Sequence, residues 1–284
     1  MLRDRFPEAH LEILGAKQIA VLAEKRFYAD AVRSLESGSL ALCFARNAAL
    51  PTELTDYFAR FDLILSFLYD PDQIFEANVR AASRATFIAG PSKLDDSEHA
   101  AFQLARPLQL LGLSLTDPSP RLFPNNEDRN AVRRFRECTV AVHSGSGSET
   151  KNWPIENWIK LGDVLLEKGQ RLLIVAGEAD AARTQKFRAA WKDKSVQFAE
   201  HLPLPHLAAL LENKAFIGHD SGISHIAAAV GAQCLLLFGW TDPAIWAPRN
   251  ANVTVLRAPD GKIAELDLDS VLAAYELMRI GIRT

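Results

Sequence analysis

A cluster of polar residues follows an apolar strand in the second half of the chain. The strand is predicted over 215–217, and the small apolar residues of 221–230 predict a tightly packed helix. Asp220, Ser221 and Gly222 fall at the start of this helix, where unpaired backbone N–H groups and the helix dipole attract anions. The pattern therefore predicts a phosphate or carboxylate site. The alternative interpretation is a capped helix of the core.

A second polar loop follows another predicted strand, 139–142. Its small residues Ser144, Gly145 and Ser146 precede Lys151, so that backbone amides, hydroxyls and an ammonium group lie close together in sequence. These groups suit a diphosphate. The spacing to the lysine excludes a Walker loop, and the third glycine of the dinucleotide fingerprint is absent. A flexible surface turn is the alternative interpretation.

Ser221 and His225 lie four residues apart, a spacing that invites a nucleophile and base interpretation. No nucleophile-elbow motif accompanies the pair. We therefore favour a His225 side chain that donates a hydrogen bond to the ligand or locks the loop. His219, Asp220 and His225 lack a recognised ligand spacing, so no metal site is expected.

The composition is that of an ordinary globular protein. The 284 residues are 48% hydrophobic and 24% charged, and their net charge of -3 argues against a dedicated nucleic-acid binder. Cys43, Cys138 and Cys234 form no CxxC pair and suit a reduced, cytoplasmic protein. Neither a signal peptide nor a membrane anchor is expected at the N-terminus.

Short apolar runs alternate with stretches of helical period in the second half, which predicts a parallel sheet wrapped by helices, with ligands beyond the carboxyl ends of its strands. The strands are expected at 139–142, 171–176, 196–198, 215–217 and 234–238, and the helices at 154–168, 181–191, 205–213 and 221–230.

The first half alternates less regularly and predicts a smaller α/β domain. Its strands are expected at 11–14, 40–44, 62–65 and 86–88, and its helices at 17–25, 71–83 and 98–111. A linker rich in Pro, Asn, Asp and Arg is expected over 116–130, and a last helix over 269–279.

Three segments, in this order and spacing, resemble family 9 glycosyltransferases, the ADP-heptose:lipopolysaccharide heptosyltransferase family. They are His143-Ser-Gly-Ser-Gly with Lys151-Asn-Trp-Pro-Ile-Glu-Asn-Trp158, Gly218-His-Asp-Ser-Gly-Ile-Ser-His-Ile-Ala-Ala-Ala, and Phe238-Gly-Trp-Thr-Asp-Pro with Trp246-Ala-Pro248. The resemblance implies a GT-B-like α/β fold of two Rossmann-like domains whose parallel sheets face a central cleft. The domains would be an acceptor-side domain over 1–125 and a donor-binding domain over 126–268, with a C-terminal helix over 269–284 that packs back on the first.

The resemblance also implies the chemistry. A sugar, heptose or similar, would pass with inversion from an ADP-linked donor to a lipopolysaccharide core or related glycolipid or oligosaccharide, with no cofactor and no metal. Asp180 would lie near the nucleotide ribose, with Glu178 as the alternative. The residues expected around the donor diphosphate are Ser144, Gly145, Ser146, Lys151, Asp220, Ser221, Gly222 and His225.

The chain departs from the family pattern in places. Family members open with a strand and a Gly-x-x-Gly-Asp segment that includes the proposed catalytic Asp, and this chain is expected to begin after it, so no general base is assigned. Ser144 and Trp240 stand where the family usually has Pro. The alternative function is a non-catalytic nucleotide-sugar-binding relative, and a third hypothesis is a hydrolase or epimerase. The expected location is cytoplasmic, at the inner face of the inner membrane, with peripheral membrane association at most and no nucleic-acid partner.

Overall fold

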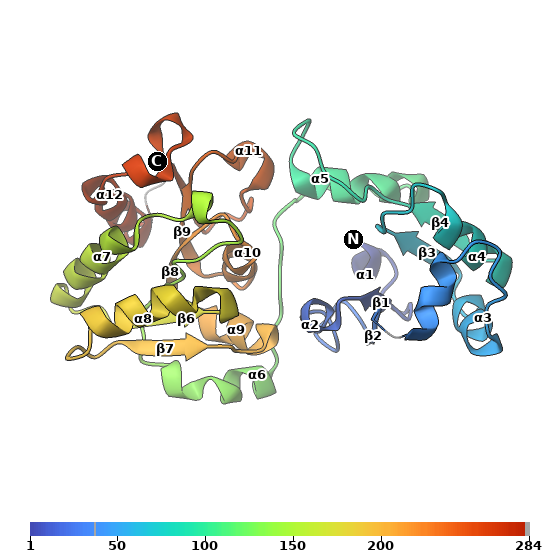
Figure 1. Cartoon of the computed structure of the whole chain (residues 1–284), viewed down its shortest axis with the longest axis horizontal. Coiled ribbons are helices and arrows are strands. Elements are labelled where there is room, and N and C mark those ends of the chain that lie inside the picture. Colours follow the sequence, from blue (N-terminus) through green and yellow to red (C-terminus); the bar gives the residue numbers. More distant parts are fainter. Residues whose placement is uncertain (37, 282–284) are drawn as a thin grey trace. The chain divides into compact units, whose positions relative to one another are not determined.

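The computed structural model describes residues 1–36 and 38–281, which form two compact α/β units (Figure 1). The first unit comprises Met1–Ala20 and Tyr28–Asp117, and the second comprises Val21–Phe27 and the chain from Pro118 onward. The chain thus passes into the second unit within the predicted linker 116–130, eight residues before the boundary that we placed after 125.

The second unit is built on a six-stranded parallel sheet with the strand order β10-β9-β8-β5-β6-β7. Its strands are β5 Val140–Val142, β6 Leu172–Ala176, β7 Gln197–Glu200, β8 Ala215–His219, β9 Gln233–Phe238 and β10 Val253–Arg257. Chain order reverses between β5 and β8, so this point is the topological switch at which open α/β sheets bind ligands beyond the strand ends.

Helices cover both faces of this sheet, which explains why its strands read as continuous apolar runs. Ala141 of β5 lies in the same hydrophobic core as Leu207 and Ile226. Val140 and Val142 lie in a second core on the other face of the sheet. The helices of the second unit are α6 Asn126–Ala131, α7 Ile155–Glu167, α8 Ala181–Ala190, α9 Leu204–Leu211, α10 Gly222–Ala229, α11 Pro243–Trp246 and α12 Leu268–Arg279.

The last helix, α12, packs on α7, β9 and β10. Val271 and Tyr275 are buried in the core that also contains Leu161 of α7. The apolar face of α12 is therefore buried within the second unit, and its packing on the first unit stays a prediction.

The first unit contains two separate parallel pairs, β1 Glu12–Gly15 with β2 Ala31–Ser34, and β3 Leu63–Ser66 with β4 Thr86–Ala89. Its core gathers aromatic side chains such as Tyr57, Phe58 and Phe75. Its helices are α1 Leu2–Arg5, α2 Lys17–Ala20, α3 Thr52–Ala59, α4 Ile74–Ala82 and α5 Ala100–Ala105, followed by a 3₁₀ helix over Arg106–Leu111.

Two expectations for the first half are wrong. The predicted strand 40–44 lies in a 3₁₀ helix over Gly38–Phe44, in which Leu40 and Cys43, three residues apart, are buried. The predicted helix 17–25 stops at Ala20. Lys25 adopts a positive φ of 52°, and the Arg26 guanidinium binds both carboxylate oxygens of Asp128 at 2.7 Å, which holds this segment in the second unit.

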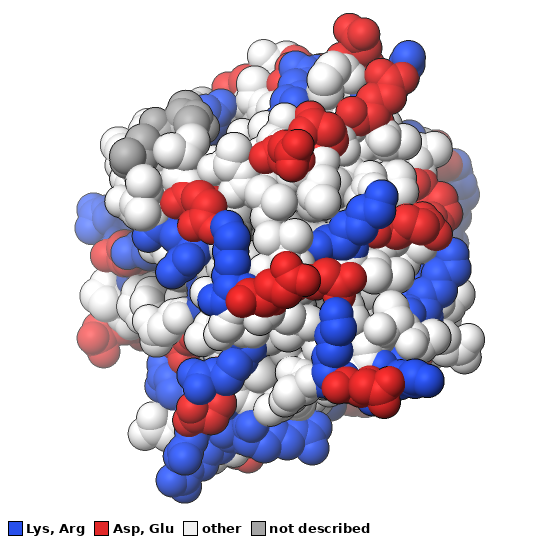
Figure 2. Space-filling model, turned by 90° about the vertical axis from the view of Figure 1, so that its left-hand side faces the viewer, with Lys and Arg blue, Asp and Glu red and all other residues white. Residues whose placement is uncertain are grey.

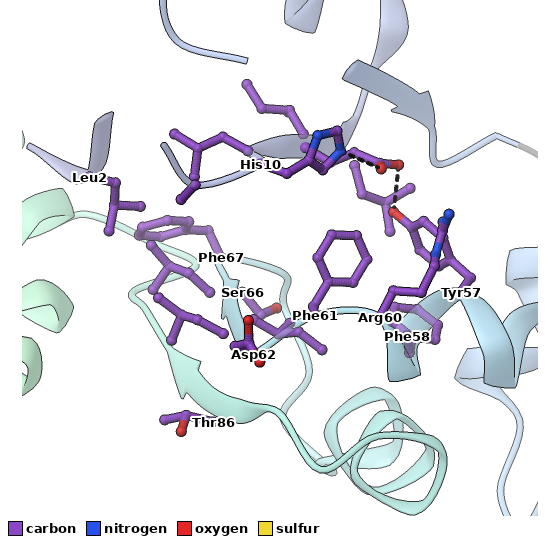
Figure 3. A pocket seen from close by; sticks show the side chains of 18 of the residues that line it. Leu2, His10, Tyr57, Phe58, Arg60, Phe61, Asp62, Ser66, Phe67 and Thr86 are labelled. Atoms are coloured by element: carbon purple, nitrogen blue, oxygen red, sulfur yellow. Dashed lines mark hydrogen bonds and ion pairs between the residues drawn. The ribbon is translucent and has the colours of Figure 1, made fainter. Parts of the chain in front are cut away.

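A pocket of about 950 Å³ lies in the first unit and is lined by residues of both β1 and β3 (Figure 3). The carbonyl oxygens of Asp62 and Ser66 accept hydrogen bonds from the N–H groups of Thr86, the first residue of β4, and Gly90, the residue after it. Because only alternate residues of a strand bond to a given parallel neighbour, the N–H and C=O groups of Leu63 and Leu65 point away from β4. At the pocket's polar end the Tyr57 hydroxyl donates to Glu12 Oε1 at 2.9 Å. Burial and this bond raise the pKa of Tyr57, so the phenol stays a neutral donor.

Charged side chains are interspersed on the surface. Lys and Arg alternate with Asp and Glu on the face drawn in Figure 2. Arg46 and Arg80, two cations of the first unit, lie 2.9 and 2.8 Å from Asp72 and Glu76. Within residues 1–36 and 38–281, no helix combines the length and the hydropathy needed to cross a bilayer.

Candidate functional site

The two polar loops predicted from the sequence meet at the topological switch point. Lys151 follows β5 through its loop, Asp220 directly follows β8, and β5 and β8 are hydrogen-bonded neighbours in the sheet. The Lys151 ammonium donates to Asp220 Oδ2 at 2.6 Å. This contact brings together two residues 69 positions apart, one from each of the two predicted loops.

The start of α10 is capped and open. Ser221 is the N-cap residue, and its hydroxyl accepts a hydrogen bond from the Ser224 N–H at 3.4 Å. Gly222 is exposed, and a Cβ added there would meet no atom within 4 Å. Because the first N–H groups of a helix have no partner within the helix, this edge offers room and donors to an anion.

The loop after β5 is folded on itself. The Ser146 hydroxyl donates to the Ser148 carbonyl at 2.7 Å and accepts from the Ser148 N–H at 3.3 Å. Ser144 is buried and Ser146 is half-buried. Ser146 is therefore the more accessible of the two predicted hydroxyl donors.

Asp180 lies beneath this loop and is buried. Its carboxylate accepts from the Gly177 N–H at 2.8 Å and lies 3.5 Å from His143 Nε2. Burial raises the pKa of Asp180, but the hydrogen bonds from His143 and Gly177 outweigh it and hold the pKa below its usual value. The Asp180 carboxylate thus lies against Gly145. Glu178, two residues after β6, is exposed instead.

His219, at the end of β8, is a structural residue that the sequence did not reveal. It is fully buried, its Nε2 accepts from the Trp153 N–H at 2.9 Å, and its ring meets that of Trp158 edge-on. Burial, together with the neighbouring His143 and Arg183, lowers the pKa of His219 to about 3. A neutral His219 therefore joins the end of β8 to the segment that follows Lys151.

The low pKa of His219 predicts that the folded protein loses stability in mild acid. The unfolded chain protonates His219 at its ordinary pKa of about 6.5, whereas the folded protein does not do so until about pH 3. The free energy of unfolding should therefore fall as pH drops below 6.5, by about 2 kcal/mol at pH 5 from this residue alone.

Urea unfolding at pH 7 and pH 5 measures this effect. His219→Gln supplies an uncharged acceptor for the Trp153 N–H and should show a smaller difference between the two pH values, whatever its absolute stability. An equal difference in the variant and the parent protein would show that His219 does not cause it.

Trp240 is a further site residue, located two positions after β9. Its indole N–H donates to Thr150 Oγ1 at 3.3 Å, and its ring centroid lies 5.5 Å from the Lys151 ammonium. The available signal was its position just beyond a predicted strand, at the edge that carries the other two loops.

His225 is half-buried on α10, four residues after the N-cap. Among the described residues, no three His, Cys, Asp or Glu side chains are grouped closely enough to hold a metal ion. Of the predicted donor-site residues, the structure brings together Lys151, Asp220 and the start of α10.

Part of the chain is similar to known proteins. Residues 97–275 match the glycosyltransferase family 9 (heptosyltransferase) profile. Lipopolysaccharide heptosyltransferase 1 of Escherichia coli O18:K1:H7 is 29% identical over 139 residues, which are 48% of this chain and 41% of that protein. The match thus spans less than half of this curated relative.

Solved structures support the fold. A family 9 glycosyltransferase from Veillonella parvula has a TM-score of 0.79 at 18% identity, covering 98% of this chain and 91% of its own. An E. coli ADP-heptose LPS heptosyltransferase II has a TM-score of 0.74 at 15% identity, covering 98% and 92%. The GT-B-like α/β fold is thereby confirmed, while a central cleft between the two domains stays a prediction.

Proposed function

Because the chain belongs to glycosyltransferase family 9, we propose that it transfers a sugar from an ADP-linked donor to a lipopolysaccharide core or a related surface glycan. The observation that carries the proposal is the meeting of Lys151, Asp220 and the start of α10 at the topological switch point. The Lys151 ammonium and the N–H groups at the start of α10 suit a diphosphate, and the open space over Gly222 gives it room.

From the strand order we infer how the donor would lie along the sheet edge. The diphosphate would lie beyond β5 and β8, where Lys151 and the amides of α10 point. The nucleoside would lie toward β6, where the exposed Glu178 would accept a hydrogen bond from the ribose. In this assignment Glu178 binds the ribose, as in the alternative that we gave to Asp180. The Asp180 carboxylate instead holds the loop after β5 in position.

The choice of donor and acceptor is supported by the similar proteins. One of the similar solved structures is an ADP-heptose LPS heptosyltransferase, and the curated relative is a lipopolysaccharide heptosyltransferase. We propose a heptose or a similar sugar as the transferred group.

The proposed reaction inverts the anomeric centre in one displacement. A carboxylate base, which we leave unassigned, removes the acceptor hydroxyl proton while that oxygen attacks the anomeric carbon, and the bond to ADP breaks. Lys151 and the first turn of α10 would stabilise the negative charge that develops on the leaving diphosphate.

Thermal unfolding with ADP tests the donor site. At a concentration 100 times its Kd, ADP should stabilise the folded protein by about 2.7 kcal/mol, which raises Tm by roughly 5–10 °C. The Gly222→Ala variant should unfold like the parent without ligand, because its Cβ meets no atom, yet show a smaller shift, because the methyl fills the space over the helix start.

A transfer assay separates the two functional hypotheses. Incubation with ADP-heptose and heptose-free lipopolysaccharide core should yield ADP and a heptosylated product. Binding of ADP without transfer would favour the non-catalytic alternative, and a Tm unaffected by ADP, UDP and GDP would refute the donor site itself.

A further inference from the structure

Trp240 is unusually exposed for a tryptophan. Its side chain is 60% exposed, whereas Trp153, Trp158 and Trp191 are at most 4% exposed. An indole exposes a large apolar surface to water at a cost in free energy, so a tryptophan is normally buried for most of its area. An exposed indole next to a charged cluster therefore suggests a ligand that covers it.

The backbone that carries Trp240 is firmly packed. Gly261 adopts a positive φ of 72°, and a Cβ there would lie 3.1 Å from the Trp240 Cα atom. A Cβ on Gly239 would lie 3.2 Å from the Gly261 carbonyl oxygen. On the other side, Asp242 caps α11 by accepting from the Ala244 N–H at 2.9 Å. Gly239 before Trp240 and Asp242 two residues after it are thus both held by close contacts.

The indole itself is also held in place. Its N–H donates to Thr150, and the positive charge of Lys151 lies 5.5 Å from the ring centroid. These contacts attach the ring to the loop that follows β5 while leaving more than half of the side chain exposed. The arrangement presents a flat, preorganised apolar surface beside the proposed diphosphate site.

The strand order indicates which part of a donor would meet this surface. Along the sheet edge, β6 comes first, β5 and β8 follow, and β9 comes next. If the nucleoside lies toward β6 and the diphosphate beyond β5 and β8, the group on the far phosphate lies toward β9. Trp240 follows β9, so it is on the side of the transferred sugar.

We propose that Trp240 is the platform on which the sugar ring of the donor stacks, and that it therefore determines donor specificity. This inference rests on the proposed function. A pyranose ring presents an apolar C–H face that packs on an aromatic ring, and covering the indole would exclude water from the sugar–phosphate bond. The residue positions the sugar and takes no part in proton transfer.

Calorimetric titration with ADP and with ADP-heptose tests the proposal. Trp240→Ala should weaken ADP-heptose binding about 3- to 10-fold more than it weakens ADP binding. Trp240→Phe keeps a flat ring and should retain most of the affinity for ADP-heptose. Tryptophan emission of the parent protein should respond more strongly to ADP-heptose than to ADP, since the sugar changes the exposure of Trp240.

Three results would overturn the proposal. Equal losses for ADP and ADP-heptose in Trp240→Ala would place the ring on the nucleotide, and unchanged affinities would place it outside the site. A Phe variant as weak as the Ala variant would exclude stacking on a flat ring. Failure of the parent protein to bind ADP would instead contradict the proposed function.

Discussion

Replacing Lys151 with alanine is expected to weaken ADP binding at least 30-fold. Removing one member of a hydrogen-bonded charge pair at a binding site costs about 2–5 kcal/mol, and 2 kcal/mol corresponds to about 30-fold in affinity. The loss is large here because Asp220, now without its cation at 2.6 Å, would repel the diphosphate. Calorimetric titration with ADP measures the change.

A surface pair of the same length provides the control. The Lys168 ammonium lies 2.6 Å from Glu276, where both side chains are well exposed. Lys168→Ala should leave ADP affinity unchanged and alter stability by less than about 1 kcal/mol. Adding Asp220→Asn to Lys151→Ala should recover part of the lost affinity, because the repulsion is removed. If Lys151→Ala bound ADP as tightly as the parent, the diphosphate would have to lie elsewhere.

The second unit could be predicted from the sequence because its strands are buried by helices on both faces. That burial requires continuous apolar runs such as 172–176, and these runs are visible without an alignment. The helix starts that follow β5 and β8 carry turn and capping residues, which indicated the edge where ligands bind. The predicted strands at 171–176, 215–217 and 234–238 are all confirmed.

Half-buried elements gave weaker signals. The strand β10, Val253–Arg257, lies at the sheet edge and is only partly buried, so its pattern resembles that of a surface segment. Conversely, we predicted a strand from the apolar run 40–44, which lies in a 3₁₀ helix. A run this short does not show whether its buried positions repeat every two residues, as in a strand, or every three. The helix α3 did carry a signal that we missed, since Leu54, Tyr57 and Phe58 have helical spacing and are buried.

Contacts between segments that are distant in the sequence could not be predicted either. The acidic position after β6 is visible in sequence, but its orientation is not. Asp180 turns inward because the Gly177 N–H and His143 both bind its carboxylate, whereas Glu178, two residues earlier, stays exposed. Nothing in the sequence around Asp180 reports that Gly145 will lie against it.

Gly145 should be the least replaceable glycine of the donor loop. A Cβ at this position would lie 1.7 Å from Asp180 Oδ1, well below any possible contact distance. Asp180 could move away only by losing the bond from the Gly177 N–H and its contact with His143. Gly145→Ala should therefore displace the loop, destabilise the fold by roughly 1–3 kcal/mol and weaken ADP binding through the displaced Lys151.

Gly147 of the same loop provides the comparison, because a Cβ there would meet no atom within 4 Å. Gly147→Ala should unfold in urea within about 0.5 kcal/mol of the parent. Asp180→Asn keeps the size of the side chain but removes its charge, so it cannot relieve the clash, whereas Asp180→Gly can. Recovery of stability in the Gly145→Ala, Asp180→Gly double variant relative to the sum of the single changes would therefore locate the cause in this contact. Strict additivity would show that the two residues act independently.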